Sequence, residues 1–97
     1  MSIGDTIEIK SPEKFKEILS SVQECIEDGS LIQVWPKDII TASSIKVEDF
    51  PKDGPYKDSY SFFFKDAENY YSLYVSFYHG RSGEWKMLKD YETPEFK

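Results

Sequence analysis

The chain has 97 residues, a length that suits one domain built around one hydrophobic core. Its 18 acidic and 12 basic residues give a net charge of −6, which argues against nucleic-acid binding, because Lys and Arg supply most of the affinity for phosphates. No apolar run approaches the roughly 20 residues that a membrane span needs, so we expect no membrane association.

The N-terminus and the cysteine content both bear on location. Residues 1–5 lack the basic and apolar regions of a signal peptide. Cys25 is the only cysteine, so the chain cannot form an internal disulfide, whereas small secreted domains are commonly disulfide-rich. These features predict a cytoplasmic protein.

A short strand and then a helix open the predicted fold. Residues 6–10 alternate apolar and polar side chains, which indicates a strand. Ser11 is a good N-cap, Pro12 suits the first helical position, and Gly29 suits a left-handed C-terminal cap, so we place a helix at 12–28. Its apolar positions recur at spacings of three and four and form one stripe for packing on a core: Phe15, Ile18, Leu19, Val22, Cys25 and Ile26.

The rest of the chain reads as strands and turns. Turn residues at 66–69 and 80–83 separate apolar, aromatic runs, which favours a meander. We therefore predict an α+β fold in two layers, with the N-terminal helix packed on an antiparallel meander sheet of four to six strands. Residues 1–90 form the single domain and 91–97 a frayed tail. The later strands are predicted at 31–35, 39–47 (broken at 42–43), 59–65, 70–79 and 84–88.

One face of this sheet stays free of the helix, and strand alternation assigns residues to it. In strand 70–79, the set with Leu73 and Val75 faces the helix. Tyrosine and serine suit protein recognition, because tyrosine offers a large contact area with few rotatable bonds. Tyrosine is also favoured on any exposed strand by cross-strand pairing, so both interpretations stay open. The predicted open face contains Phe63 with Tyr70, Ser72, Tyr74, Ser76 and Tyr78.

Carboxylates gather at two places. Glu24, Glu27 and Asp28 oppose the negative end of the helix dipole, and residues placed against local stability are candidates for function. A solvated helix end that tolerates this cost is the alternative. The second group follows the third predicted strand, where interspersed lysines and the lack of alternating ligands argue against a calcium site. Its members are Glu48, Asp49, Asp53 and Asp58.

No set of residues matches a catalytic or metal motif. His79 is the only histidine, and with Cys25 it could form a nucleophile–base pair only if the two met in space. Cys25 lies on the apolar helix stripe, where a structural role is expected. One histidine and one cysteine cannot build a tetrahedral zinc site. We expect no cofactor, no metal and no enzymatic activity.

The short acidic chain, the helix with an antiparallel meander and the many aromatic residues resemble the small immunity proteins that bacteria make against their own toxins. Contact-dependent inhibition and other polymorphic toxin systems contain such proteins. The segment 78–85, Tyr-His-Gly-Arg-Ser-Gly-Glu-Trp, is similar to hairpins in these families. The resemblance covers the chain as a pattern and carries over no residue roles. It implies a tight complex with a toxin domain, often a nuclease with a basic active site.

We therefore expect an immunity protein that blocks the active site of a basic, nuclease-type toxin domain. Two alternatives remain: a small RNase-like enzyme that uses His79 and Arg81, and a housekeeping or phage-encoded protein-binding adaptor. The sequence leaves the oligomeric state open. The predicted partner-binding residues are Glu24, Glu27, Asp28, Asp49, Asp53, Asp58, Phe63, Tyr70, Tyr74 and Tyr78.

Overall fold

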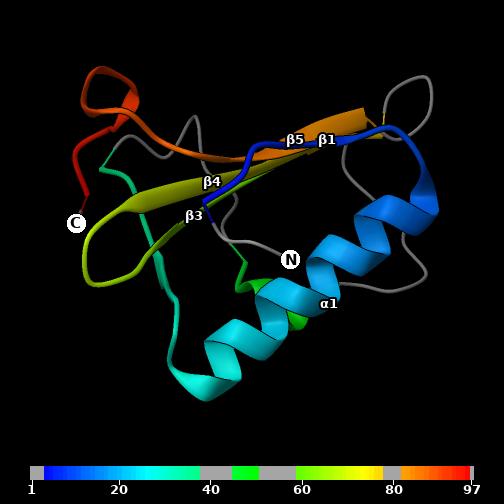
Figure 1. The fold of residues 1–97 in the computed structure, drawn as a ribbon, viewed down its shortest axis with the longest axis horizontal. Coiled ribbons are helices and arrows are strands. Elements are labelled where there is room, and N and C mark those ends of the chain that lie inside the picture. The colour runs from blue at the N-terminus through cyan, green and yellow to red at the C-terminus, as the bar shows by residue number, and fades with distance from the viewer. Residues whose placement is uncertain (1–3, 38–44, 51–58, 78–81, 97) are drawn as a thin grey trace.

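The computed structural model describes residues 4–37, 45–50, 59–77 and 82–96. Within them, one α-helix packs on one five-stranded antiparallel sheet, which confirms the predicted α+β class (Figure 1). No helix in these ranges is both long and apolar enough to cross a membrane. The elements are β1 (Ile7–Ile9), α1 (Pro12–Asp28), β2 (Ile32–Val34), the 3-10 turn η2 (Val47–Asp49), β3 (Ser59–Lys65), β4 (Tyr70–Ser76), β5 (Ser82–Met87) and the 3-10 turn η3 (Asp90–Glu92).

The helix begins and ends where its caps predict. The Ser11 side chain accepts a hydrogen bond from the Lys14 backbone N–H at 3.1 Å, which satisfies one of the free donors of the first turn. Gly29 adopts φ 84°, a left-handed conformation that suits glycine, and its N–H donates to the Ile26 carbonyl. These local signals confirm the helix predicted at 12–28.

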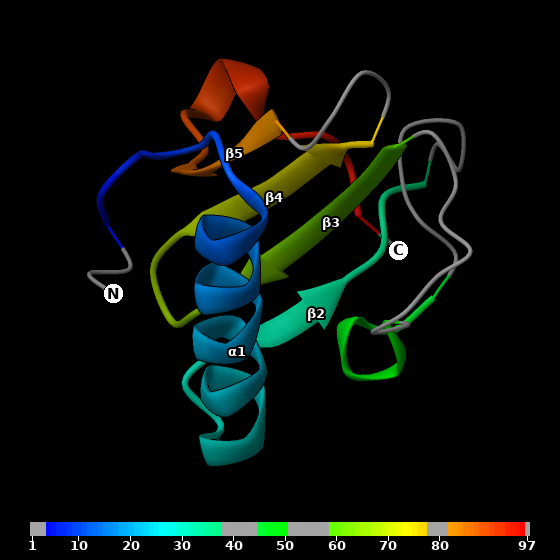
Figure 2. The same cartoon turned by 90° about the vertical axis from the view of Figure 1, so that its right-hand side faces the viewer.

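The strand order is β1-β5-β4-β3-β2, with every neighbouring pair antiparallel. Strands β2 to β5 form the meander, and β1 adds to the far side of β5. The first two strands thus lie at opposite edges of the sheet, and α1 carries the chain from one edge to the other. Figure 2 shows the helix lying across one face of the strands. Val47 and Phe50, from the segment at 45–50, add to the core on this face.

The core lies between α1 and this face. Leu73, at the centre of the sheet, pairs with Phe62 on one side and Trp85 on the other, and all three are at most 1% exposed. Large aromatic side chains therefore supply much of the buried area of a small domain. The buried apolar residues are Ile9, Phe15, Ile18, Val22, Leu31, Val47, Phe50, Tyr60, Phe62, Phe64, Tyr71, Leu73, Val75 and Trp85.

The strand predicted over 39–47 is wrong in the part that the structure describes. Residues 47–49 form η2, and the backbone of Ile45 and Val47 bonds to the side chain of Gln33 instead of to a neighbouring strand. The first part of the predicted strand, at 39–41, lies outside the described residues. Elsewhere in the sheet, β3 and β4 begin at the predicted residues.

The C-terminal segment also differs from the frayed tail that the sequence predicts. Its turn η3 is followed by residues that return to the sheet, where the Lys37 N–H donates to the Glu95 carbonyl at 2.8 Å. Pro36 and Phe96 form an isolated antiparallel bridge. Single residues hold this segment on the sheet, so its sequence shows no periodic hydrophobic pattern. A prediction from hydrophobic patterns therefore does not detect that the segment is ordered.

Candidate protein-binding surface

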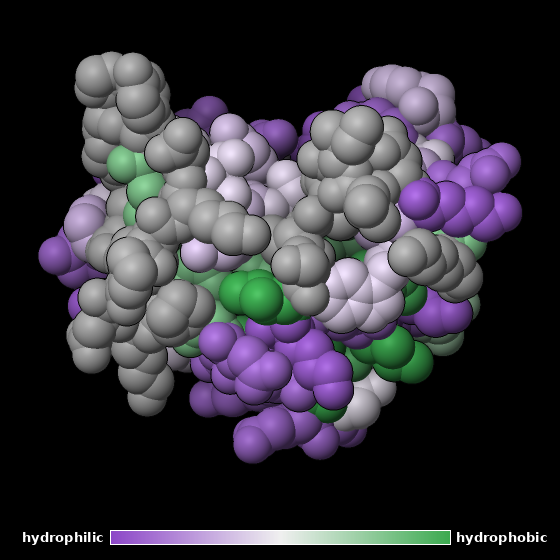
Figure 3. Space-filling view, turned by 180° about the vertical axis from the view of Figure 1, so that it is seen from behind, coloured by the Kyte–Doolittle hydropathy of each residue, from purple (hydrophilic) through white to green (hydrophobic). Residues whose placement is uncertain are grey.

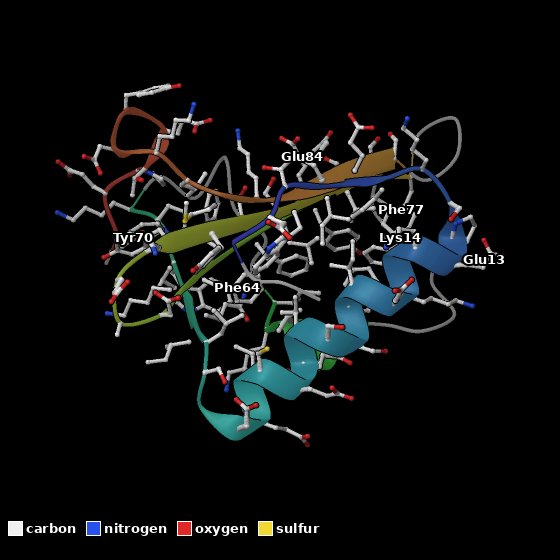
Figure 4. The ribbon with its side chains drawn as sticks, in the orientation of Figure 1. Glu13, Lys14, Phe64, Tyr70, Phe77 and Glu84 are labelled. Carbon is white, nitrogen blue, oxygen red and sulfur yellow. The ribbon has the colours of Figure 1, made fainter. Side chains whose placement is uncertain are left out.

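Three of the predicted binding residues share the sheet face that points away from the helix. Phe63, Tyr70 and Tyr74 alternate with buried core residues along β3 and β4, which turns their side chains to the opposite side. Figure 4 shows Glu84 and Phe64 on opposite sides of the sheet, with Phe64 toward the helix. This second surface, away from α1, is called the open face below.

The predicted acidic residues of the helix lie in the other layer of the molecule. Glu24, Glu27 and Asp28 are exposed near the C-terminal end of α1. Asp49 is exposed in η2, which packs against α1. The structure therefore does not combine these carboxylates with the open face into one continuous surface. The remaining predicted positions, Asp53, Asp58 and Tyr78, lie outside the described residues, as do His79 and Arg81.

Asp28 has a local role that explains its place at the negative end of the helix. Its carboxylate accepts hydrogen bonds from the backbone N–H of Ser30, at 2.8 Å, and from the Ser30 hydroxyl. The hydroxyl contact is the largest cause that lowers the pKa of Asp28, followed by the backbone bond. The charge is thus held by the turn that follows the helix, so its position does not by itself indicate a partner.

The open face has a carboxylate pair that sequence reasoning did not identify. Glu8 in β1 lies directly opposite Glu84 in β5, and Glu84 lies directly opposite Tyr74 in β4. We call these three residues the Glu8–Glu84–Tyr74 row. Like charges that face each other across strands are destabilising. The alternation of strand 6–10 predicts the face of Glu8, but only the pairing register brings it beside Glu84.

Lys86 connects this row to the C-terminal segment. Its ammonium group lies 2.6 Å from a Glu92 carboxylate oxygen but 3.8 Å from that of Glu84. The Glu92 hydrogen bond is the largest cause that raises the pKa of Lys86. Glu92 also accepts from the Lys89 backbone N–H, which fixes the carboxylate in η3. Among the described residues, the lysine that pairs with Glu84 is therefore held more closely by another acid.

A second cluster on the open face consists of aromatic rings. Phe96 stacks on Tyr70 with ring centroids 4.7 Å apart and meets Phe63 edge-on at 5.9 Å. Two of the predicted aromatic anchors thus pack against the C-terminal segment of the same chain. Tyr74 remains 42% exposed, so among the predicted anchors that the structure describes it is the best placed to contact a partner. No local pattern in the sequence points to Phe96, because its ring partners are distant along the chain.

Other parts of the described surface offer less to a partner. In the view of Figure 3, the hydrophobic residues that can be seen reach the surface in small, separate patches among hydrophilic ones. Large apolar interfaces need a contiguous patch. Ile32 and Met87 are 57% and 40% exposed, but they belong to β2 and β5, which β3 and β4 separate.

Cys25 does not have the environment of an activated nucleophile. It packs against the core, and burial is the largest cause that raises the pKa of its thiol, followed by the Asp28 and Glu24 carboxylates. A raised pKa keeps the thiol protonated, whereas an activated cysteine needs the thiolate. Among the residues with described positions, no three His, Cys, Asp or Glu side chains gather as metal ligands.

Comparisons with models of protein families, with curated proteins and with solved structures found no significant match to this chain.

Proposed function

We propose that this chain is a binding protein that neutralises a basic protein, specifically a bacterial toxin domain, by holding its open face against the active site of the toxin. It acts as an immunity protein in the cytoplasm of the producing cell. The observation that carries the proposal is the Glu8–Glu84–Tyr74 row, in which two carboxylates and an exposed tyrosine follow one another across three neighbouring strands, on a sheet face that α1 does not cover.

The row combines the two properties that an inhibitor of a basic domain requires. An exposed tyrosine gives a rigid contact area, and interface hot spots are enriched in this residue. The carboxylates complement a basic active site, and the net charge of −6 increases the rate of encounter with a basic partner. The helix-end acids Glu24 and Glu27 contribute to this long-range attraction from the other layer.

Matched charge variants test the surface. Glu8→Gln with Glu84→Gln removes two charges from the open face, and Glu24→Gln with Glu27→Gln removes two from the helix. Both variants carry the same net charge, so both should lower the association rate equally to the extent that this rate depends on long-range attraction. The open-face pair should in addition accelerate dissociation, because its carboxylates contact the partner. Surface plasmon resonance at two salt concentrations separates the two effects; the partner is the toxin domain that this proposal expects to be encoded beside the chain.

Tyr74→Ala should accelerate dissociation by about tenfold or more if Tyr74 is a hot spot. Tyr91→Ala is the control, because Tyr91 is 82% exposed and lies in η3. Equal dissociation rates for both variants would exclude the row as the contact surface. Cell survival tests the biological role: cells that express the toxin domain should die without this chain and live with it. Death in both cases would refute the immunity function.

A further inference from the structure

We propose that the Glu8–Glu84–Tyr74 row is a receptor for an arginine side chain of the partner. This inference rests on the proposed function and deepens it, because it names the group that the row recognises. A guanidinium group would lie on the exposed ring of Tyr74 and donate hydrogen bonds to the carboxylates of Glu84 and Glu8.

The first argument is the excess of negative charge around the row, because in the described part of the chain three carboxylates, those of Glu8, Glu84 and Glu92, share the two lysines Lys10 and Lys86. Glu8 and Glu84 face each other across two antiparallel strands, and their side chains are 68% and 42% exposed. The Lys10 ammonium group lies 3.1 Å from the Glu8 carboxylate, but Lys10 is 81% exposed, and pairs between such exposed side chains are weak. A cation that binds between the two carboxylates would therefore reduce their repulsion.

The second argument is the position of Lys86. This residue forms a loose ion pair with Glu84, at 3.8 Å, and a much closer one with Glu92, at 2.6 Å. Glu92 is fixed in η3 by the Lys89 backbone N–H and holds Lys86 on the side toward the C-terminal segment. The C-terminal segment thereby keeps Glu84 accessible to an external cation.

The third argument is the shape of the row, which favours arginine over lysine. Neighbouring strands lie about 4.8 Å apart, so consecutive side chains of the row are separated by about the width of a guanidinium group. A guanidinium is planar, stacks on an aromatic ring and donates through several N–H groups at once. An ammonium group is a compact point charge, so it cannot both stack on the Tyr74 ring and reach the two carboxylates as a guanidinium can.

The probe is a capped tripeptide, glycine-arginine-glycine, with lysine and citrulline versions for comparison. Citrulline keeps the shape of arginine without the charge. We expect the arginine peptide to bind the full-length protein at low salt about threefold or more tightly than either of the others. Amide shifts in a two-dimensional NMR titration should concentrate at Glu8, Glu84 and Tyr74. Equal affinity for arginine and lysine peptides, or shifts centred on α1, would overturn the proposal.

Two further variants test the role of Lys86. Glu92→Gln releases Lys86 to pair with Glu84, so the arginine peptide should bind more weakly than it does to Glu13→Gln, a control with the same change in charge on the exposed start of α1. Lys86→Gln removes the competitor, and in this background Glu92→Gln should lose its specific effect. If Glu92→Gln weakens binding equally with and without Lys86, the competition does not exist and the proposal fails in this part.

The two proposals have distinguishable outcomes. Selective binding of the arginine peptide by a protein that does not rescue cells from the toxin domain refutes the immunity function and supports the receptor. The opposite outcome is also possible: the protein rescues cells, but its double variant Glu8→Gln with Glu84→Gln binds the toxin domain as tightly as the double variant Glu24→Gln with Glu27→Gln. That result refutes the receptor and supports the immunity function.

Discussion

Gln33 holds the buried backbone of Val47 through its side chain. The Oε1 atom of Gln33 accepts from the Val47 N–H at 2.8 Å, while its Nε2 donates to the Ile45 carbonyl at 3.1 Å. Val47 itself is fully buried. One amide thus substitutes for a neighbouring strand, satisfying backbone groups that would otherwise be buried without partners.

Gln33→Leu should therefore destabilise the protein. The replacement is similar in size but leaves the Val47 N–H without its acceptor, which costs about 1–3 kcal/mol of unfolding free energy. Gln23→Leu is the comparison, since within the described residues the Gln23 side chain makes one hydrogen bond, donating to the Val47 carbonyl at 3.1 Å. Urea unfolding measures both. A loss in Gln33→Leu no greater than that in Gln23→Leu would contradict this account.

Gly83→Ala should disrupt the contact between β5 and β4. A Cβ atom at Gly83 would lie 1.9 Å from the Tyr74 carbonyl oxygen, and this oxygen belongs to the backbone, so it cannot rotate away. We expect a loss of about 3 kcal/mol or more, the upper part of the range for overpacking. Gly4→Ala is the control, because nothing lies within 4 Å of a Cβ atom there. Similar melting temperatures for the two variants would show that the sheet relaxes freely.

The hairpin between β3 and β4 should make stability depend on pH at the acidic end. The Tyr71 hydroxyl donates to the Asp66 carboxylate at 2.6 Å, and this bond is the largest cause that lowers the pKa of Asp66. A lowered pKa contributes stability that is present above the unfolded value, near 3.9, and is lost as the pH falls through the folded value. Tyr71→Phe should flatten this acidic loss in urea melts between pH 5 and pH 2.

The same residue should act at the alkaline end. Burial, and then the hydrogen bond to Asp66, raises the pKa of Tyr71 to about 12. Its stabilising contribution is complete below the unfolded value, near 10, and is lost as the pH rises toward the folded value. Tyr71→Phe should therefore lose less stability than the wild type between pH 10 and pH 12. Tyr91→Phe controls for exposed tyrosines, and a variant curve parallel to that of the wild type at both ends would refute the assignment.

Phe96→Ala should release the C-terminal segment from the open face. It removes the ring that stacks on Tyr70 and meets Phe63 edge-on, and aromatic pairs contribute about 0.5–1.5 kcal/mol each beyond their buried area. The most direct measurement is hydrogen exchange of the Lys37 amide, which donates to the Glu95 carbonyl and should exchange faster. Tyr91→Ala should leave this amide unchanged. Unaltered exchange in Phe96→Ala would mean that other contacts hold the segment.

The elements that the sequence predicts well depend on neighbouring residues. Ser11, Pro12 and Gly29 determine where α1 begins and ends, and each acts within one turn of its own position. Strand alternation likewise assigns Leu73 to the core and Tyr74 to the open face, because it needs no knowledge of which strand lies beside β4.

The candidate site depends on which strands pair and in which register, and short stretches of sequence do not indicate this. Nothing near Glu8 indicates that it will lie opposite Glu84, since β1 skips the nearer strands and joins β5. The apolar pattern around Val47 predicts a strand, and nothing local corrects it, because the Gln33 side chain that bonds Val47 is remote in sequence. Phe96 belongs to no periodic pattern, and only the folded chain brings it onto Tyr70.

The pairing of β1 with β5 has a consequence for folding during synthesis. Of the five described strands, β1 leaves the ribosome before the others and has no partner until β5, the last of the five, emerges, whereas β2, β3 and β4 can join as each one emerges. Pairing between distant segments is slow, and an unpaired strand edge is prone to aggregation. Until β5 appears, β1 is a free strand of three residues that includes a carboxylate, Glu8, and is followed by Lys10. Its shortness and its charges protect the nascent chain from the wrong partners during that interval.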